Sequence, residues 1–152
     1  MPQHLSTPHA VSEFMLDRTG RALLNSDAQL FETCMALPQH METFEGRIYC
    51  ETIAHLHTIF YSVVDHMHRC NVTDLARHCI AAEYRGPDTI EATHETRILS
   101  GTRVIQPAYP VFSILQRIEG RWKITYSMYA ITDAPAHSQA LISVPPPERA
   151  IS

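Results

Sequence analysis

The spacing of hydrophobic side chains changes about halfway along the chain, and this change limits the fold more than any single motif. From about Arg47 to His68 the apolar residues recur at helical spacing and form one stripe: Tyr49, Ile53, Leu56, Phe60, Val63, Val64 and Met67. From about Asp74 onward the spacing becomes two, which is typical of half-buried strands. Helical segments that precede a run of strands predict an α+β domain and not alternating βαβ units.

Two further helices are predicted ahead of the long one, which gives three N-terminal helices. The first covers about 12–24, although Gly20 lowers its helix propensity. Ser26 and Gln29 have the spacing of a capping box, so a short second helix is expected to run to about Cys34.

The two ends of the chain differ in composition from its middle. Residues 1–11 are polar, include two prolines and are predicted to be disordered. Residues 134–152 contain three consecutive prolines, which have no N–H to donate, so a Pro-rich tail of extended chain is expected there. The segment 12–133 is then the folded domain, and 152 residues suffice for one core.

The charge balance and the cysteines exclude several classes of protein. Twelve Lys and Arg against sixteen Asp and Glu leave no basic surplus, so we expect no nucleic-acid partner. No apolar run is long enough to span a bilayer, and the first residues lack the apolar core of a signal peptide, so we expect no membrane partner either. Four cysteines without a CxxC pair indicate reduced thiols and a cytoplasmic location.

A first hairpin is predicted between residues 76 and 98. Its even-numbered positions are apolar on both strands except for two histidines and Thr96. If Arg77 faces Glu95, then His78 faces His94 on the apolar side of the sheet. Two adjacent imidazoles suit general acid/base catalysis, because each takes up and returns a proton near neutral pH. The alternative is that both are core histidines with ordinary hydrogen-bond partners.

A second hairpin is predicted from 111–118 and 122–131, joined by the three-residue loop Glu119-Gly120-Arg121. In that register Ile118 faces Trp122 and apolar residues meet on one side throughout. We expect this side to face an interior cavity, where its residues contact a ligand or fill the space: Phe112, Ile114, Trp122, Tyr126 and Met128.

Ten histidines raise the question of a metal site. No HExxH motif occurs, and Glu95 would point to the opposite sheet face from His94, so we expect no metal and no other cofactor. On the long helix, His55 and His66 fall opposite the apolar stripe and are expected to be solvated.

The order of helix, short helix, strand, long helix and four strands resembles the NTF2-like superfamily, and Leu115–Ile124 resembles its closing hairpin. The resemblance covers about 12–133. It implies an NTF2-like cone, in which three N-terminal helices pack on a curved, mostly antiparallel sheet. It also implies a homodimer formed through the outer sheet face. SnoaL-type cyclases, ketosteroid isomerases and scytalone dehydratases of this superfamily hold small apolar substrates in the cone, whereas nuclear transport factor 2 binds proteins.

Two short segments are similar to scytalone dehydratase, namely Arg77–Ala82 and Thr93–Ile98, and this likeness implies His78 and His94 as catalytic residues. The chain departs from that family where it has Leu23, Leu24 and Met41 in place of an aspartate and two tyrosines. Ketosteroid isomerases carry a carboxylate base on the first strand, where this chain has His40 and Glu42.

Two tyrosines are further candidates for hydrogen bonds to a substrate oxygen, Tyr49 and Tyr126. The sequence therefore predicts a small-molecule-binding, SnoaL-like protein whose ligand is an apolar, oxygenated ring compound. The catalytic interpretation is a lyase, isomerase or cyclase that moves a proton with His78 and His94. The alternative is a non-catalytic binding or dimerisation module with a filled cavity.

Overall fold

The protein is described by a computed structural model that covers residues 7–132 and 134–146, and it has the predicted α+β architecture. The helices are α1 (Pro8–Leu24), α2 (Ala28–Thr33), α3 (Ile53–Arg69) and α4 (Pro135–Ile142). The strands are β1 (Met35–Thr43), β2 (Gly46–Cys50), β3 (Asp74–Tyr84), β4 (Thr89–Ser100), β5 (Arg103–Val104), β6 (Tyr109–Ile118) and β7 (Arg121–Tyr129).

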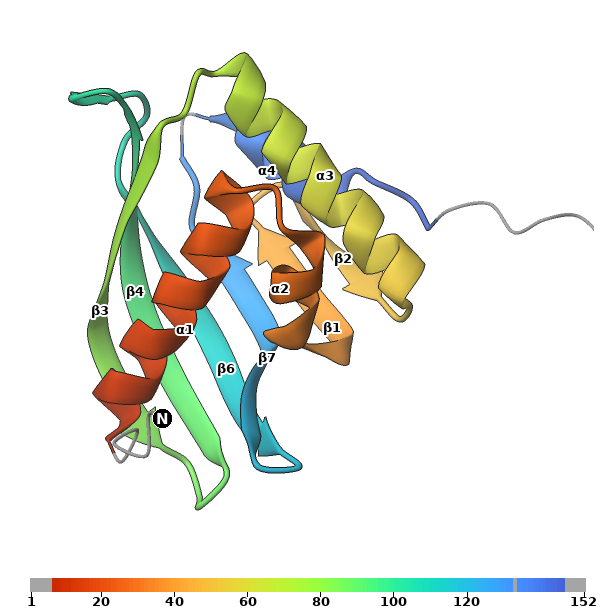
Figure 1. Ribbon diagram of the computed structural model, residues 1–152, viewed down its shortest axis with the longest axis vertical. Coiled ribbons are helices and arrows are strands. Elements are labelled where there is room, and N and C mark those ends of the chain that lie inside the picture. The colour runs from red at the N-terminus through yellow and green to blue at the C-terminus, as the bar shows by residue number, and fades with distance from the viewer. Residues whose placement is uncertain (1–6, 133, 147–152) are drawn as a thin grey trace, which may run out of the picture.

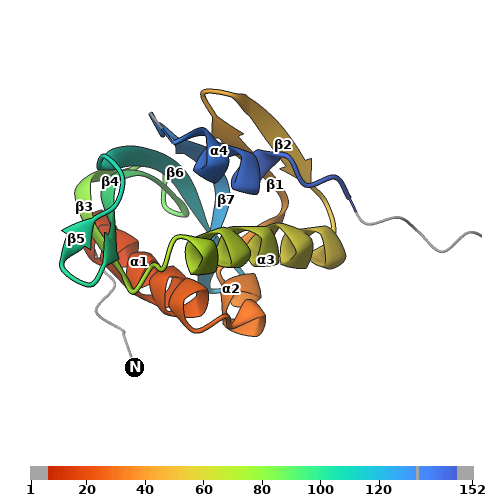
Figure 2. The same ribbon diagram turned by 90° about the horizontal axis from the view of Figure 1, so that it is seen from above.

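One curved sheet holds all the strands in the order β2-β1-β7-β6-β4-β3, with β5 attached to β4. Every pairing is antiparallel except that of β1 with β7. Irregularities between Cys79 and Ala81 and between Ile114 and Leu115 bend the long strands, because a bulge increases local twist. The sheet therefore curves around a hollow that α1, α2 and α3 cover (Figures 1 and 2).

The first two helices begin at side-chain caps, and the cap of α2 differs from the predicted one. Thr7 Oγ1 accepts the Ala10 amide at 3.1 Å, so α1 starts earlier than predicted and includes residues 8–11. Asp27, not Ser26, caps α2 by accepting the Leu30 amide at 3.0 Å. The disorder predicted for 1–11 therefore fails for residues 8–11, and residues 1–6 lie outside the described part of the chain.

The long helix is shorter than its hydrophobic stripe suggested. Thr52 Oγ1 accepts the His55 amide at 3.1 Å and starts α3 at Ile53. The residues before it form β2, where Tyr49 pairs with His40 of β1 and is 46% exposed. Tyr49 and Ile53 are four residues apart, which is the spacing of one helical face, so the sequence pattern put both on one stripe. In the structure only Ile53 belongs to the helix.

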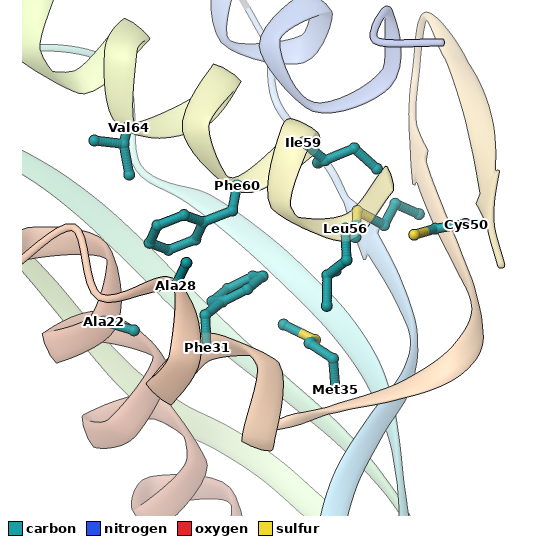
Figure 3. Close-up of a cluster of buried hydrophobic side chains, with 10 residues drawn as sticks. Ala22, Ala28, Phe31, Met35, Cys50, Leu56, Ile59, Phe60 and Val64 are labelled. Carbon is teal, nitrogen blue, oxygen red and sulfur yellow. The ribbon is translucent and has the colours of Figure 1, made fainter. Parts of the chain in front are cut away.

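Leu56, Phe60 and Val64 of the stripe form a core cluster with residues of α1, α2, β1 and β2, as Figure 3 shows. Val63 and Met67 belong to a second cluster, and Ile53 is 42% exposed. Phe60 of α3 packs on Phe31 of α2 with ring centroids 4.8 Å apart. Leu56, Met35 and Cys50 continue this cluster towards the sheet. Each fully buried side chain of this size contributes about 1.5–3 kcal/mol to folding.

The C-terminal segment is not extended throughout, which corrects the prediction of a simple Pro-rich tail. Residues 135–142 form α4, which packs on α3 and near β1 and β2 (Figure 2). Beyond α4, the Val144 carbonyl accepts a hydrogen bond from His55 Nε2 at 2.9 Å, so His55 is buried and not solvated as predicted. The last of the three prolines, Pro147, lies outside the described residues.

None of the helices in the described ranges combines the length and the apolar content that a bilayer crossing requires.

The four cysteines are free thiols, with Cys34, Cys50 and Cys79 buried and Cys70 partly exposed.

Candidate functional site

A cavity of about 100 Å³ lies between the hollow face of the sheet and the helices. One water molecule needs about 10–15 Å³, so the space suits a small organic molecule. Most of its wall is apolar, with contributions from α1, α2, α3, β1, β4 and β6: Met15, Phe31, Ile59, Met41, Ile98 and Leu115. Enclosed apolar walls with a few polar groups are typical of ligand pockets.

The strand register gathers polar side chains on one part of the cavity wall. Arg77 of β3, Thr96 of β4 and Tyr109 of β6 are cross-strand neighbours in one row. The next row contains His94 of β4 and, two strands further, Tyr129 of β7. All five residues line the cavity, so the sheet itself holds the polar groups in fixed positions.

His94 is the most unusual of these residues, because it is only 7% exposed and its Nε2 atom has no hydrogen-bond partner in the described part of the chain. Burial, with smaller contributions from Arg77 and His78, lowers the pKa of His94 to about 3. His94 is therefore neutral near pH 7. A buried polar atom without a partner costs about 1–3 kcal/mol, which a ligand with a suitable oxygen would recover.

Arg77 is held against α1 by neutral oxygen atoms. Its Nη2 donates to the Leu16 carbonyl at 2.5 Å and to Thr19 Oγ1 at 2.6 Å. Gly20 gives the guanidinium room, because a Cβ on that residue would lie 3.1 Å from Nη2. Burial lowers the pKa of Arg77, but arginine stays charged near pH 7.

A second polar group lines the cavity where α3 and α4 approach β6. Cys70 Sγ lies 3.8 Å from His66 Nε2, and the His66 ring stacks on His137 with centroids 5.5 Å apart. Gln106 Nε2 donates to His137 Nδ1 at 3.1 Å, and burial lowers the pKa of His137 to about 4. His66 thus faces the cavity and not solvent as predicted. No three metal-ligating side chains within the described ranges are placed to share an ion.

The predicted pairing of His78 with His94 is wrong. His78 pairs with Glu95 and is exposed, while His94 pairs with Cys79. The register differs by one residue from the predicted one, so Arg77, not His78, faces the interior beside His94. A bulge after Cys79 then shifts the pairing by a further residue.

The second hairpin has the predicted pairs Phe112–Met128 and Ile114–Tyr126. Its loop contains two residues, Glu119 and Gly120, both with positive φ, so Trp122 pairs with Arg117 and not with Ile118 as predicted. The predicted residues of these two strands point away from the cavity. The residues that alternate with them point into it and line it: Val111, Ser113, Leu115, Ser127 and Tyr129.

Most of the remaining predicted site residues form one group on the outer sheet face, which we call the outer patch: His40, Glu42, Tyr49, Phe112, Ile114, Tyr126 and Met128. The His40 and Tyr49 rings lie 4.6 Å apart, and the Tyr126 hydroxyl donates to Glu42. That bond raises the pKa of Tyr126 to about 12. Trp122 contacts Tyr84 and Arg117 instead. None of these residues lines the cavity.

Sequence reasoning thus located His94 in the cavity and missed other polar residues that line it, namely Arg77, Thr96, Tyr109, His66 and His137. One feature of the sequence pointed to Arg77. Gly20 lies inside a helical pattern, and a residue without a side chain at that position leaves room for a large side chain, here that of Arg77, to pack on the helix.

Solved structures similar to this one share its fold. A cystatin-like protein of unknown function from Nostoc punctiforme matches with a TM-score of 0.62 and 13% identity, over 81% of this chain and 90% of that one. A second cystatin-like domain of unknown function from that organism gives 0.64 and 8%, over 84% and 80%. An NTF2-like protein of unknown function from Shewanella oneidensis gives 0.61 and 8%, over 82% and 99%.

No protein-family model matches the chain, and no curated protein sequence matches it. The structural likeness shows that the chain has the NTF2-like, or cystatin-like, cone fold, as the sequence resemblance implied. At identities of 8–13% the likeness concerns the fold alone.

Proposed function

We propose that the protein binds a small, largely apolar molecule that carries oxygen atoms, inside the cone and in contact with His94. The observation that carries this proposal is the buried Nε2 atom of His94, which lines the cavity without a partner in the described residues. The apolar wall around it would bury the rest of the molecule.

The finer proposal is proton transfer of the lyase, isomerase or cyclase type. In this proposal the neutral His94 accepts a proton from a carbon next to a carbonyl, and the electron pair moves to the carbonyl oxygen as an enolate. The negative charge that forms beside the imidazole raises its pKa above the ligand-free value of about 3. The positive charge of Arg77 on the adjacent row would stabilise that oxygen. Return of the proton to another carbon is isomerisation, and loss of a neighbouring hydroxyl group as water is dehydration. His78 has no part in this proposal, because it lies on the outer face.

The alternative is a non-catalytic module. In the form that the sequence predicts, Phe112, Ile114, Trp122 and Met128 fill the cavity, but none of these residues lines it. Ligand binding without catalysis retains support from the same cavity.

We also propose that the protein is a homodimer that pairs through the outer patch. Four residues of the patch lie on the adjacent strands β6 and β7 and are partly exposed: Phe112, Ile114, Tyr126 and Met128. Three of these four side chains are apolar. Contiguous apolar surface of this kind is typical of interfaces. The cytoplasmic location inferred from the free cysteines stays a prediction.

Ligand binding is tested by thermal-shift screening with hydroxylated polycyclic and steroid-like ketones. Wild type is compared with His94→Leu, which removes the polar ring, and with the control His78→Leu, which changes an exposed histidine on the next strand. We expect ligands that raise Tm for wild type and for the control but not for His94→Leu. Equal shifts in all three proteins would exclude His94 as a binding group.

A further inference from the structure

Arg77 brings a positive charge to the cavity wall without a negative partner. Its hydrogen bonds go to a carbonyl and a hydroxyl oxygen, and no carboxylate of the described residues lies within ion-pair distance. Other arginines of the protein that form ion pairs do so on the surface: Arg21, Arg85, Arg97 and Arg117. A charge facing an apolar cavity is costly unless it is paired.

The groups around Arg77 do not supply the missing charge. Tyr109 and Tyr129 are neutral, because burial raises the pKa of both phenols. Asp17 of α1 lies on the surface, where it pairs with Arg21 at 2.9 Å. His94 is neutral as well, so the polar part of the wall carries one net positive charge.

Arg77 also has donors left for a ligand. A guanidinium has five N–H groups, and among the described residues only those of Nη2 have partners. The hydrogen bonds to α1 fix the guanidinium, so little side-chain entropy is lost when a ligand binds. Gly20 supports the same placement, because glycine inside a helix costs about 1 kcal/mol relative to alanine and here accommodates Arg77.

We propose that the ligand of the cone is a hydrophobic carboxylic acid, bound as its anion with the carboxylate between Arg77 and His94. This inference rests on the proposed binding function and names its ligand class. One carboxylate balances the single positive charge, whereas a phosphate monoester carries about −1.5 to −2 and would leave excess negative charge in an apolar space. His94 donates to the second carboxylate oxygen in the tautomer that carries hydrogen on Nε2.

The apolar part of the acid lies against the side chains beyond the polar rows, including Met15, Phe31 and Ile59. A flat ring system suits these walls better than a long flexible chain, because it loses less conformational entropy on binding.

The experiment compares matched acid and amide probes by calorimetry at pH 7.5, with 2-naphthoate against 2-naphthamide and cinnamate against cinnamamide. The two members of each pair share their ring and shape and differ in charge. We expect wild type to bind each acid at least tenfold more tightly than its amide. Arg77→Met should abolish this preference and keep the amide affinity within about threefold. Arg77→Lys, which keeps the charge, should retain part of the preference.

The matched control is Arg97→Met, which removes an exposed arginine from the adjacent strand β4 with the same change in net charge. It should keep the wild-type preference for acids. Equal binding of acid and amide by wild type overturns the carboxylate inference and leaves the binding function standing. A preference that survives in Arg77→Met also overturns it. If neither these probes nor the neutral ketones bind wild type, the proposed function fails and the inference fails with it.

Discussion

At the scale of single residues, the polar wall of the cavity has a free-energy cost in the ligand-free protein. His94 leaves a buried nitrogen without a partner, and Arg77 holds a charge without a counterion in the described structure. A chain selected for stability alone would carry apolar side chains at these positions, since removing both the charge and the unpaired nitrogen would stabilise it. This cost is the strongest reason to regard the cavity as a binding site.

The two deeply buried histidines predict how stability depends on pH. Burial holds the pKa of His94 at about 3 and that of His137 at about 4, against 6.5 in the unfolded chain. The unfolded chain therefore binds protons that the folded chain does not, and stability is lost as pH falls from about 6.5 towards 4. At pH 5.5 the two residues together should lower the free energy of unfolding by about 3 kcal/mol relative to pH 7.5.

Urea unfolding at these two pH values measures this loss. The double variant His94→Leu with His137→Leu should lose most of the pH dependence, whereas His78→Leu should keep it, because His78 is exposed. An unchanged pH dependence in the double variant would contradict the prediction.

At the scale of elements, short polar signals decided where helices and strands begin. Thr7, Asp27 and Thr52 each accept a backbone amide at the first turn of a helix. The hydrophobic stripe of α3 continues into β2, so periodicity could not separate the two elements, and Thr52 did. Capping interactions therefore set boundaries that hydrophobic patterns leave open.

The start of α2 gives a test of this point. Asp27→Ala should lower the free energy of unfolding by about 1 kcal/mol, because it leaves the Leu30 amide without its acceptor. Ser26→Gly should be neutral or slightly stabilising, since Ser26 has a φ of 53°, which glycine adopts more easily. Chemical denaturation of both variants measures these changes. The reverse order of effects would favour the capping box at Ser26.

At the scale of the whole molecule, the curved sheet places the two proposed functions on opposite faces. The hollow face encloses the cavity with its polar rows, and the outer face carries the outer patch. β6 and β7 serve both faces through alternate residues, so a substitution on one face should leave the other intact.

The outer patch should therefore control assembly without affecting the ligand. We expect wild type to be a dimer in sedimentation experiments and Phe112→Asp to be a monomer that retains ligand binding. Val104→Asp is the control, because Val104 is 52% exposed on the short strand β5, away from the patch. A monomeric wild type, or a dimer that survives Phe112→Asp, would contradict the proposed interface.

The sequence by itself determined the class of the fold and the order of its main elements, but not β2, which overlaps the predicted long helix, nor β5 and α4, which were not predicted. The stripe that includes Leu56 and Phe60, the change to period two after Asp74, and the turn at Gly120 were sufficient for the α+β class, and the resemblance to the NTF2-like superfamily implied the cone fold. These features depend on contacts between neighbours in sequence and on one apolar face per helix, so they can be inferred without the tertiary structure.

Only the tertiary structure decided which face of each strand is inside. On β6 both faces carry apolar residues, with Phe112 and Ile114 outside and Val111 and Leu115 inside, so alternation alone could not distinguish them. On β3 a one-residue difference in register exchanged His78 for Arg77 at the cavity. Because side chains alternate along a strand, such a difference moves every residue to the other face, and it is fixed by bulges and by packing against α1.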